Sequence, residues 1–420
     1  MSLSVNYNGI PSSIKENPNW NQELQAFKNT INDEKYGFFN VTDRTELITQ
    51  CQDVHKKFSH FKTFVQVGIG GSSLGPEMII SALQKNDTHF EFINNIDPDK
   101  IYSQLSSIEI TKSLFYFVSK SGGTAETMAS LAIITNKLLE AGIAKEKWNE
   151  HIVFATDPVK SDLLNLGKEL NITRLEVPSN VGGRFSVFTP VGYLPALFAG
   201  INIEELANGA NSLKESLLNE SSENDLIKTA HAMLELKEKF QVGQTVMMPY
   251  SSKLRDLSFW FVQLWAESLG KKVDLNGEVV ETGFTPIPGY GATDQHSQVQ
   301  LFMEGTRDKL VCFIEVENFD HDFKLKNELG VPALDRLNNS SLSQLMKAEL
   351  EGTMKALEAQ SRPYLTFKIN KLDEIAMGQL VLFFESLTAL MGHKLNIDPF
   401  DQPGVEAGKI FAFEWLNQLK

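Results

Sequence analysis

The 420-residue sequence predicts an α/β protein built on two mainly parallel sheets. Short apolar runs alternate with helical patterns from residue 64 onward, which is typical of parallel strands joined by right-handed crossovers. A second group of apolar runs begins near residue 245, after a long helical stretch. The length and the 42% apolar content fit two packed domains.

The first group of expected strands lies between residues 64 and 177. Its members are FVQVGI, FEFINNI, LFYFVS, HIVFAT and ITRLEV, separated by helical patterns such as PEMIISALQ and TAETMASLAIITNKLLEAG. We assign them to a first domain, residues 61–195. Residues 1–60 are expected to form helices and loops that pack on a larger domain.

The second domain is expected over residues 196–420. It opens with a helical stretch at about 196–241, and its strands are TVMMPYS, KLVCFIEVEN and RPYLTFKIN. Two further helical segments, residues 374–392 and 404–419, end the chain.

The segment LRDLSFWFVQLWAESLGKK, residues 254–272, predicts a helix that is buried nearly all round, because its middle is apolar except for Gln263. Glu267 lies four residues after Gln263, so the two side chains share one helix face. A carboxylate removed from water needs a partner or a function. Either this face binds a polar ligand, or Glu267 pairs with Lys271 one turn on.

Charge and cysteine content exclude several classes of protein. A net charge of -14 argues against nucleic acid as a partner. Cys51 and Cys312 provide neither a disulfide framework nor zinc-ligand spacing, so we expect no metal.

The first residues do not resemble a signal peptide, and Glu385 interrupts the best apolar run, so we expect a cytoplasmic protein with no membrane partner.

The first expected strand runs into a glycine-rich loop, residues 68–76. Glycines let the backbone approach a ligand, and the amides that open the next helix favour an anion. Three other interpretations stay open. Gly68, Gly70 and Ser73, followed by Asp97, form an incomplete dinucleotide fingerprint; residues 71–75 match the G-x-S-x-G nucleophile motif around Ser73; and a tight turn can bind nothing.

A second loop, residues 119–127, gathers four hydroxyl groups at a helix start, although capping needs only one. They belong to Ser119, Ser121, Thr124 and Thr127. Ligands of doubly wound sheets sit beyond the carboxyl ends of the strands, so both loops would converge on one phosphate. Because the sequence has no G-x-x-x-x-G-K-[ST] motif, a monophosphate is favoured over a nucleoside triphosphate.

Three further residues stand out in short motifs. Arg184 in VGGRFS is expected to be a buried, fixed guanidinium rather than a surface cation. His296 in GATDQHSQVQ precedes an expected helix, although a lone histidine is more often structural. Lys409 in FDQPGVEAGK lies on the terminal helix, where a solvated lysine is the ordinary interpretation.

These motifs, with the Ala-Glu-Ser-x-Gly-Lys ending of the central helix and SKSGGTAET, resemble those of glucose-6-phosphate isomerases in type and order, from about Gly68 to Lys409. The resemblance implies two αβα sandwich domains of the sugar-isomerase type, a homodimer, and no metal or organic cofactor. It implies reversible isomerisation of glucose 6-phosphate and fructose 6-phosphate through a cis-enediol intermediate. The chain is shorter than the animal members.

The resemblance also implies roles for individual residues. Glu267 is similar to the base that moves a proton between sugar carbons, and Arg184 to the cation that steadies the intermediate. His296, lent by the neighbouring subunit and oriented by Glu126, resembles one half of the ring-opening pair, and Lys409 the other. The implied substrate contacts are Gly71, Ser72, Ser119, Lys120, Ser121, Thr124, Thr127, Gln263 and Gln402.

Two points qualify the resemblance. Gly123 stands where many members have threonine, so one hydroxyl contact is missing. Sugar-phosphate loops of this type also resemble those of regulatory sensors that bind without converting. A sensor, however, has no use for a base on a buried helix, so an enzyme is the favoured interpretation.

Overall fold

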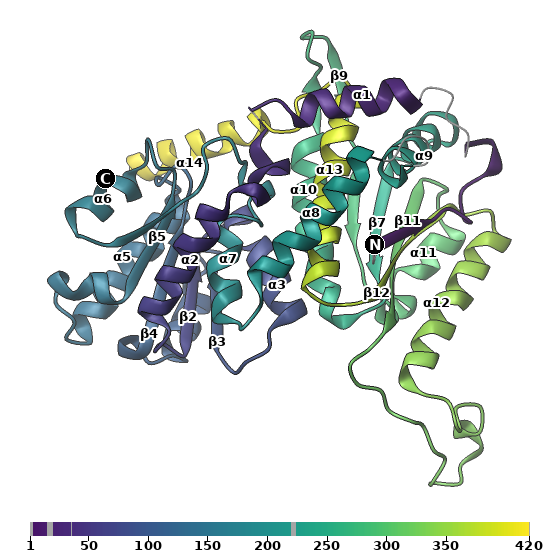
Figure 1. Ribbon diagram of the computed structural model, residues 1–420, viewed down its shortest axis with the longest axis horizontal. Helices are drawn as coiled ribbons and strands as arrows, with labels where there is room; N and C mark the ends of the chain where they lie inside the picture. The colour runs from purple at the N-terminus through teal and green to yellow at the C-terminus, as the bar shows by residue number, and fades with distance from the viewer. Residues whose placement is uncertain (1–2, 15–19, 35, 220–223, 420) are drawn as a thin grey trace.

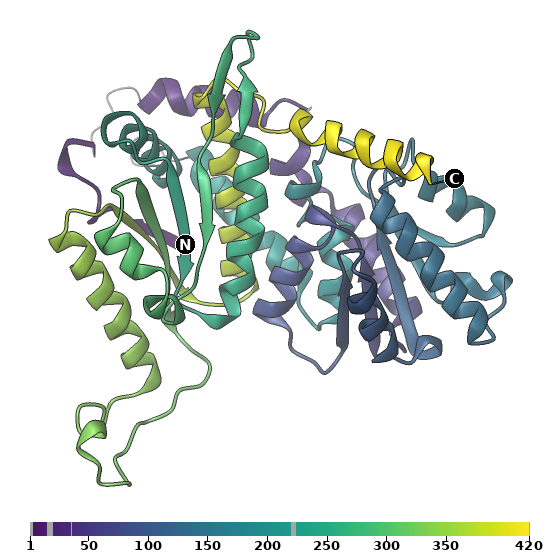
Figure 2. The same ribbon diagram turned by 180° about the vertical axis from the view of Figure 1, so that it is seen from behind.

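Two five-stranded sheets form the framework of the protein in a computed structural model, which describes residues 3–14, 20–34, 36–219 and 224–419. Figures 1 and 2 show the sheets side by side, each with helices on both faces. The first sheet is parallel throughout, with the order β3-β2-β4-β5-β6. Its strands are β2 Thr63–Val67, β3 His89–Ile93, β4 Ser113–Val118, β5 Ile152–Thr156 and β6 Thr173–Glu176.

The second sheet has the order β1-β12-β11-β7-β10 and is parallel except for β1, which runs antiparallel to β12. Its strands are β1 Leu3–Asn6, β7 Gln244–Pro249, β10 Thr285–Pro288, β11 Lys309–Asn318 and β12 Tyr364–Lys371. A separate two-stranded ribbon pairs β8 Lys271–Val273 with β9 Val279–Thr282. The α/β class and all eight expected strands are confirmed.

Strands β1 and β10 were not expected from the sequence. The segment TPIP of β10 carries two prolines, which cannot donate to a ladder and are therefore tolerated on sheet edges. Both strands lie on the two edges of the second sheet. Strand β1 lies in the N-terminal segment for which only helices and loops were expected, and it pairs with β12 from the far end of the chain.

Helices connect and cover the strands. In the first half they are α1 Trp20–Ile31, α2 Thr45–Phe58, α3 Leu74–Leu83, α4 Pro98–Ser106, α5 Ala125–Glu140, α6 Asp162–Glu169 and α7 Pro190–Phe198. In the second half they are α8 Ile203–Asn219, α9 Asp225–Phe240, α10 Arg255–Leu269, α11 Val299–Glu304, α12 Leu342–Ala359, α13 Glu374–Lys394 and α14 Glu406–Gln418. The domain boundary drawn after residue 195 falls within α7.

Alternate residues of the buried strands face opposite helix layers. In β4, Phe115 and Phe117 face the cluster that includes α4, α5 and α6, whereas Leu114 and Tyr116 face the cluster that includes α2 and α7. In β11, Val311 and Phe313 likewise face α11 and α12. Both sheets are therefore covered on two faces, as their nearly continuous apolar runs require.

One apolar cluster joins the two sheets. It includes Leu114 of the first sheet, Phe367 of the second, and Trp260, Phe261 and Trp265 of α10 between them. Helix α10 contacts α3 of the first half and α13, β7 and β10 of the second. A polar side chain on α10 therefore lies on a helix that packs against both halves of the molecule.

Helix α13 is the one helix in the described ranges that is long and apolar enough to cross a membrane. Its apolar stretch is 94% buried inside the molecule, where it packs on α8, α9 and α10. It is accordingly a core helix of the fold.

Candidate active site

The two glycine-rich loops lie next to each other at one edge of the first sheet. Strands β2 and β4 are neighbours, and the loops follow their carboxyl ends. A Cβ atom added to Gly68 would lie 3.0 Å from the carbonyl oxygen of Val118. The loops at residues 68–76 and 119–127 are thus neighbours in the fold, and their binding of one phosphate stays a prediction.

Glycines of the first loop allow two close backbone approaches. Gly70 has φ +60°, and a Cβ atom there would lie 2.7 Å from Nε2 of Gln263. A Cβ atom on Gly71 would lie 2.2 Å from the carbonyl oxygen of Gly183, so Gly71 packs directly on the backbone beside Arg184. Gly71 and Ser72 belong to a short 3-10 helix, η4 Gly70–Ser72, and both are half-buried.

Two alternative interpretations of this loop do not fit the structure. Ser73, the centre of the G-x-S-x-G match, is 1% exposed and its hydroxyl is already bound to Glu77, whereas a nucleophile elbow presents an exposed serine. Asp97 accepts hydrogen bonds from the backbone N–H groups of Asp99 and Lys100, which makes it the N-cap of α4. Neither a nucleophile elbow nor a dinucleotide site is supported.

The hydroxyl groups of the second loop do not cap α5. Thr124 is the N-cap residue but makes no side-chain cap bond; its Oγ1 lies 2.8 Å from Oγ of Ser119. Ser119 and Ser121 accept from the N–H groups of Gly122 and Gly123, at 3.1 and 3.4 Å. The hydroxyl groups are gathered at the start of α5, where uncapped amides favour an anion.

Thr127 is distinctive among these hydroxyl groups because it is 2% exposed and its Oγ1 has no hydrogen-bond partner in the described part of the chain. A buried polar atom without a partner costs free energy, and in native proteins it calls for an explanation. A ligand oxygen at the start of α5 would supply the partner.

Gly122 and Gly123 are crowded. A Cβ atom on Gly122, which has φ +74°, would lie 2.1 Å from Oγ of Ser161, and one on Gly123 would lie 3.0 Å from Oδ2 of Asp162. A threonine at position 123 would require Asp162 to move. The place of Asp162 therefore fits the glycine that this chain has instead of threonine.

Lys120 directs its ammonium group to the backbone of another segment. Nζ donates to the carbonyl oxygens of Ser179 and Val181, at 2.6 and 3.0 Å. Burial lowers the pKa of Lys120, and the charge of Asp157 partly opposes this shift. The side chain predicted to contact substrate therefore bonds to the segment that precedes Arg184.

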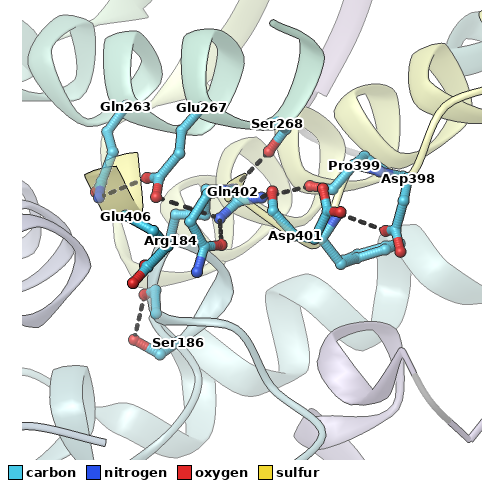
Figure 3. A network of polar contacts seen from close by, with 12 residues as sticks. Arg184, Ser186, Gln263, Glu267, Ser268, Asp398, Pro399, Asp401, Gln402 and Glu406 are labelled. Atoms are coloured by element: carbon cyan, nitrogen blue, oxygen red, sulfur yellow. Dashed lines mark hydrogen bonds and ion pairs between the residues drawn. The ribbon is translucent and has the colours of Figure 1, made fainter. Parts of the chain in front are cut away.

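Helix α10 presents the expected polar face. Its apolar residues, including Leu257, Trp260, Phe261, Leu264 and Trp265, are buried. Nε2 of Gln263 donates to Oε2 of Glu267 at 3.0 Å, and Oε1 of Glu267 lies 3.6 Å from Nη1 of Arg184 (Figure 3). The Glu267 side chain keeps 26% of its surface exposed, so one face of the carboxylate remains accessible.

The alternative pairing of Glu267 with Lys271 is wrong. Nζ of Lys271 donates to the backbone carbonyl oxygens of Glu267 and Ser268, each at 2.8 Å, and lies 3.6 Å from Oδ1 of Asp401. These carbonyls are among the last of α10, so Lys271 stabilises the end of the helix and leaves the carboxylate of Glu267 to Arg184.

Arg184 is a buried guanidinium fixed on several sides, as the sequence predicts. Its side chain is 3% exposed. It donates to Oγ of Ser268 at 2.7 Å, Oε1 of Gln402 at 3.0 Å, and the carbonyl oxygens of Pro399 and Asp401 at 2.5 and 3.2 Å (Figure 3). Burial lowers the pKa of Arg184, whereas the charges of Glu267 and Asp401 raise it. An arginine stays protonated under these conditions.

The structure brings some predicted residues together and leaves others apart. Arg184, Gln263, Glu267 and Gln402 form one cluster. Lys409 is exposed and pairs with Glu406 at 2.8 Å.

His296 ends the short 3-10 helix η9 Thr293–His296 and is exposed, and Glu126 is half-buried in the first turn of α5. Within the described residues, no hydrogen bond or ion pair joins either of them to that cluster.

Sequence reasoning missed three of the four groups that hold Arg184 and named the fourth, Gln402, only as a substrate contact. Ser268 follows Glu267 directly in the Ala-Glu-Ser-x-Gly-Lys motif, which could have pointed to it. The carbonyl oxygens of Pro399 and Asp401 carry no side-chain signal at all. Lys271, which ties the end of α10 toward Asp401, was considered only as a partner of the Glu267 carboxylate.

The arrangement suits proton transfer next to a developing negative charge. A partly exposed carboxylate on a rigid helix can take a proton, and a fixed guanidinium 3.6 Å away can stabilise an oxyanion without reorganising. The adjoining loops offer hydroxyl and amide donors to an anion. No group of three His, Cys, Asp or Glu side chains that could hold a metal ion occurs in the ranges that the structure describes.

Comparison with known proteins gives a consistent picture. The family model described as phosphoglucose isomerase matches residues 39–420. A glucose-6-phosphate isomerase of Carboxydothermus hydrogenoformans is 39% identical over 399 residues, covering 91% of this chain and 85% of that one. One of Thermus thermophilus is 38% identical over 377 residues, covering 90% and 89%. The crystal structure of a glucose-6-phosphate isomerase from Chlamydia trachomatis shares the fold with a TM-score of 0.85 at 22% identity, covering 100% and 89%.

Proposed function

The chain belongs to the phosphoglucose isomerase family and interconverts glucose 6-phosphate and fructose 6-phosphate, and we propose that Glu267 and Arg184 carry out the central proton transfer. The observation that supports this assignment is the placement of a partly exposed carboxylate 3.6 Å from a guanidinium that is fixed by four other hydrogen bonds. A sensor that only binds sugar phosphates is not favoured.

The proposed reaction moves one proton between neighbouring carbons. Glu267 takes the proton from carbon 2 of the open-chain aldose, and the electron pair forms the double bond of a cis-enediol. Arg184 stabilises the negative charge on the neighbouring oxygen, and removing such a donor typically costs about 3 to 4 kcal/mol of transition-state stabilisation. The proton of the carbon-2 hydroxyl group moves to the negatively charged oxygen of carbon 1, and Glu267 returns the carbon-bound proton to carbon 1, which gives the ketose. Gln263, bonded to Glu267, orients the carboxylate.

The phosphate group is proposed to bind at the second loop. The hydroxyl groups of Ser119, Ser121, Thr124 and Thr127 and the amides at the start of α5 would anchor the far end of the sugar. Binding energy from this remote group positions the reacting carbons over Glu267. Gly71 and Ser72 at η4 and Gln402 beside Arg184 would contact the rest of the substrate.

Ring opening is assigned to His296 and Lys409. The position of these residues supports the proposal that the enzyme is a homodimer. Neither side chain bonds to the Glu267 cluster within the described residues, so a second copy of the chain is proposed to supply His296, with Glu126 orienting it. Exposed apolar side chains that such a copy could cover lie, among the described residues, on the β8–β9 ribbon, on the excursion (the loop at residues 319–341) and on α14. The ribbon and the excursion project from the body in Figures 1 and 2.

Helix α14 supports the same proposal. Ile410, Phe411, Phe413 and Trp415 each expose between 51% and 66% of their surface, and no described residue of the helix is buried. We further propose that the enzyme acts in the cytoplasm and uses neither a metal nor an organic cofactor.

Exchange of the carbon-2 proton in heavy water tests the role of Glu267. Glu267→Gln keeps the size of the side chain but cannot accept a proton, so exchange should fall by at least about 100-fold while substrate affinity changes little. Glu304→Gln is a matched control, because Gln300 and Glu304 form the same Gln-to-Glu contact on the exposed face of α11, at 2.8 Å. Exchange at near wild-type rate in Glu267→Gln would remove Glu267 as the base.

A further inference from the structure

The segment that carries Arg184 is held between two loops of the first sheet. It runs from the end of β6 to the 3-10 helix η7 Gly183–Phe185. On one side, Gly71 packs on the carbonyl oxygen of Gly183. On the other side, Nζ of Lys120 donates to the carbonyl oxygens of Ser179 and Val181. Lys120 belongs to the same loop as the hydroxyl groups proposed to bind phosphate.

The backbone of Lys120 is also fixed. Its carbonyl oxygen accepts from the N–H of Asp157 at 3.2 Å and from Oγ1 of Thr156 at 3.3 Å, and the neighbouring carbonyl of Ser119 accepts from the same Thr156 hydroxyl at 2.7 Å. The residue therefore ties together the ends of β4 and β5 and, through its side chain, the segment after β6.

Two of the three N–H donors of the Lys120 ammonium group are used on backbone carbonyl oxygens, so a phosphate could share only the third donor unless these bonds were broken. The two hydrogen bonds are 2.6 and 3.0 Å long, and charge-assisted bonds of this kind are stronger than neutral ones. Breaking them would also leave the carbonyl oxygens of Ser179 and Val181 without this donor. These contacts indicate that the ammonium group of Lys120 holds the segment that carries Arg184 rather than the phosphate.

We propose that Lys120 is a positioning residue: it couples the phosphate loop to the segment that carries Arg184, so that loss of its ammonium group displaces the guanidinium relative to Glu267. Arg184 is reached three residues after Val181, and its other contacts come from the second half of the chain. The inference rests on the proposed function, since it assumes that Arg184 stabilises the intermediate.

A double-mutant cycle between Lys120 and Arg184 tests the coupling. Lys120→Met keeps the aliphatic stem and removes the donors, and we expect kcat to fall by about 10-fold to 100-fold, because misplacing a catalytic group by about 1 Å has effects of that size. In an Arg184→Lys background the same substitution should lower kcat by less than about threefold, because the group that it positions is already lost.

Competitive inhibition by inorganic phosphate distinguishes positioning from binding. The inhibition constant of Lys120→Met should stay within about threefold of the wild-type value, and Lys120→Arg, which can still donate to both carbonyls, should recover much of kcat. The exposed Lys112→Met, just before β4, is the matched control and should leave both quantities unchanged.

Several results would overturn the inference. A rise of tenfold or more in the phosphate inhibition constant with kcat unchanged would make Lys120 a phosphate ligand. Equal losses of kcat in the two backgrounds would show that Lys120 does not act through Arg184. A general folding defect would weaken phosphate binding and lower the unfolding temperature as well, and would equally contradict the proposal. If the wild-type chain failed to isomerise the sugar phosphates at all, the proposed function itself would be wrong.

Discussion

At the scale of single residues, the polar groups of the site are of two kinds. Some use their hydrogen-bond donors on protein partners, and others are buried without a partner. Arg184 uses its donors on Ser268, Gln402 and backbone carbonyls, so its position is set before any substrate binds. Thr127 is the opposite case: its hydroxyl is buried and has no partner in the described part of the chain. The first arrangement suits a preorganised cation, and the second suits a ligand contact.

The Thr127 hydroxyl provides a sharp test of the phosphate loop. Thr127→Val removes the hydroxyl and keeps the shape, so KM should rise by about 10-fold, the equivalent of one hydrogen bond to a charged group, with a smaller change in kcat. Stability without ligand should not fall, because the removed hydroxyl has no partner to lose.

Thr135→Val, on the same helix, is the matched control. Its hydroxyl bonds to the carbonyl oxygen of Leu131 at 2.8 Å, and neither kinetic constant should change. A large loss of kcat in Thr127→Val with KM unchanged would contradict a simple binding role. Steady-state kinetics with fructose 6-phosphate decides between these outcomes.

At the scale of elements, α13 shows that a buried carboxyl group can be a cost rather than a function. Glu385 is 0% exposed in the middle of this helix, and neither of its carboxylate oxygens has a hydrogen-bond partner among the described residues. Burial raises the pKa of Glu385 well above its ordinary value of 4.5. The side chain is therefore protonated in the folded protein over a pH range in which the unfolded chain is ionised.

The sign of the resulting pH dependence follows directly. Above the ordinary carboxyl pKa, the unfolded chain binds fewer protons at this group than the folded chain, so the group lowers the free energy of unfolding as pH rises, by up to about 1.4 kcal/mol per pH unit. The loss continues until the pH reaches the raised pKa of the folded state. Below pH 4.5 both states are protonated and the effect vanishes.

Glu385→Gln removes this titration with little change in volume. The variant should unfold at a higher temperature than the wild type at pH 8, and the difference should shrink toward pH 5. Scanning calorimetry at the two pH values measures it, with Glu215→Gln on the exposed face of α8 as the control. A constant difference across this range would show that Glu385 is ionised, or paired, in the folded protein.

At the scale of the whole molecule, the two residues proposed for ring opening make no hydrogen bond or ion pair to the Glu267 cluster within the described residues. His296 and Lys409 are exposed, and the apolar residues of α14 are uncovered. A two-fold dimer would bury such surface and build two equivalent sites, each mixing residues of both chains.

Mixed dimers test the sharing of sites. Glu267→Gln and His296→Ala subunits, each inactive on cyclic substrate as homodimers, are unfolded together and refolded. If sites are shared, each mixed dimer contains one site with both groups intact, so random pairing should restore about a quarter of the wild-type sites. If each chain builds its own site, every site lacks one group and the mixture stays inactive. Mass spectrometry of the refolded mixture verifies that mixed dimers are present.

Metal independence is a further expectation for the whole enzyme. Activity should survive prolonged treatment with EDTA, because neither the sequence nor the described residues offer a set of ligands with suitable spacing. The measurement is the isomerisation rate before and after treatment. Activity that is lost and then restored by a divalent ion would contradict it.

The sequence by itself determined the elements and the local chemistry. Alternation of apolar runs and helical patterns predicted eight strands of the two sheets, and the apolar circumference of α10 with Gln263 and Glu267 on one face marked the helix that is proposed to carry the base. Such features are local, because residues a few positions apart in one helix or strand share a face whatever surrounds them. The family motifs then added roles to these residues.

Only the tertiary structure decided which groups meet. Arg184 bonds to Ser268, 84 residues away, and to Gln402, 218 residues away, and neither distance in sequence carries a periodic signal. The same holds for the edge strand β1, which pairs with β12, and for Lys120, whose ammonium group reaches the carbonyls before Arg184 rather than the open side of its own loop. Contacts of this kind depend on how packed layers align, and backbone carbonyls, which every residue possesses, leave no trace in the sequence.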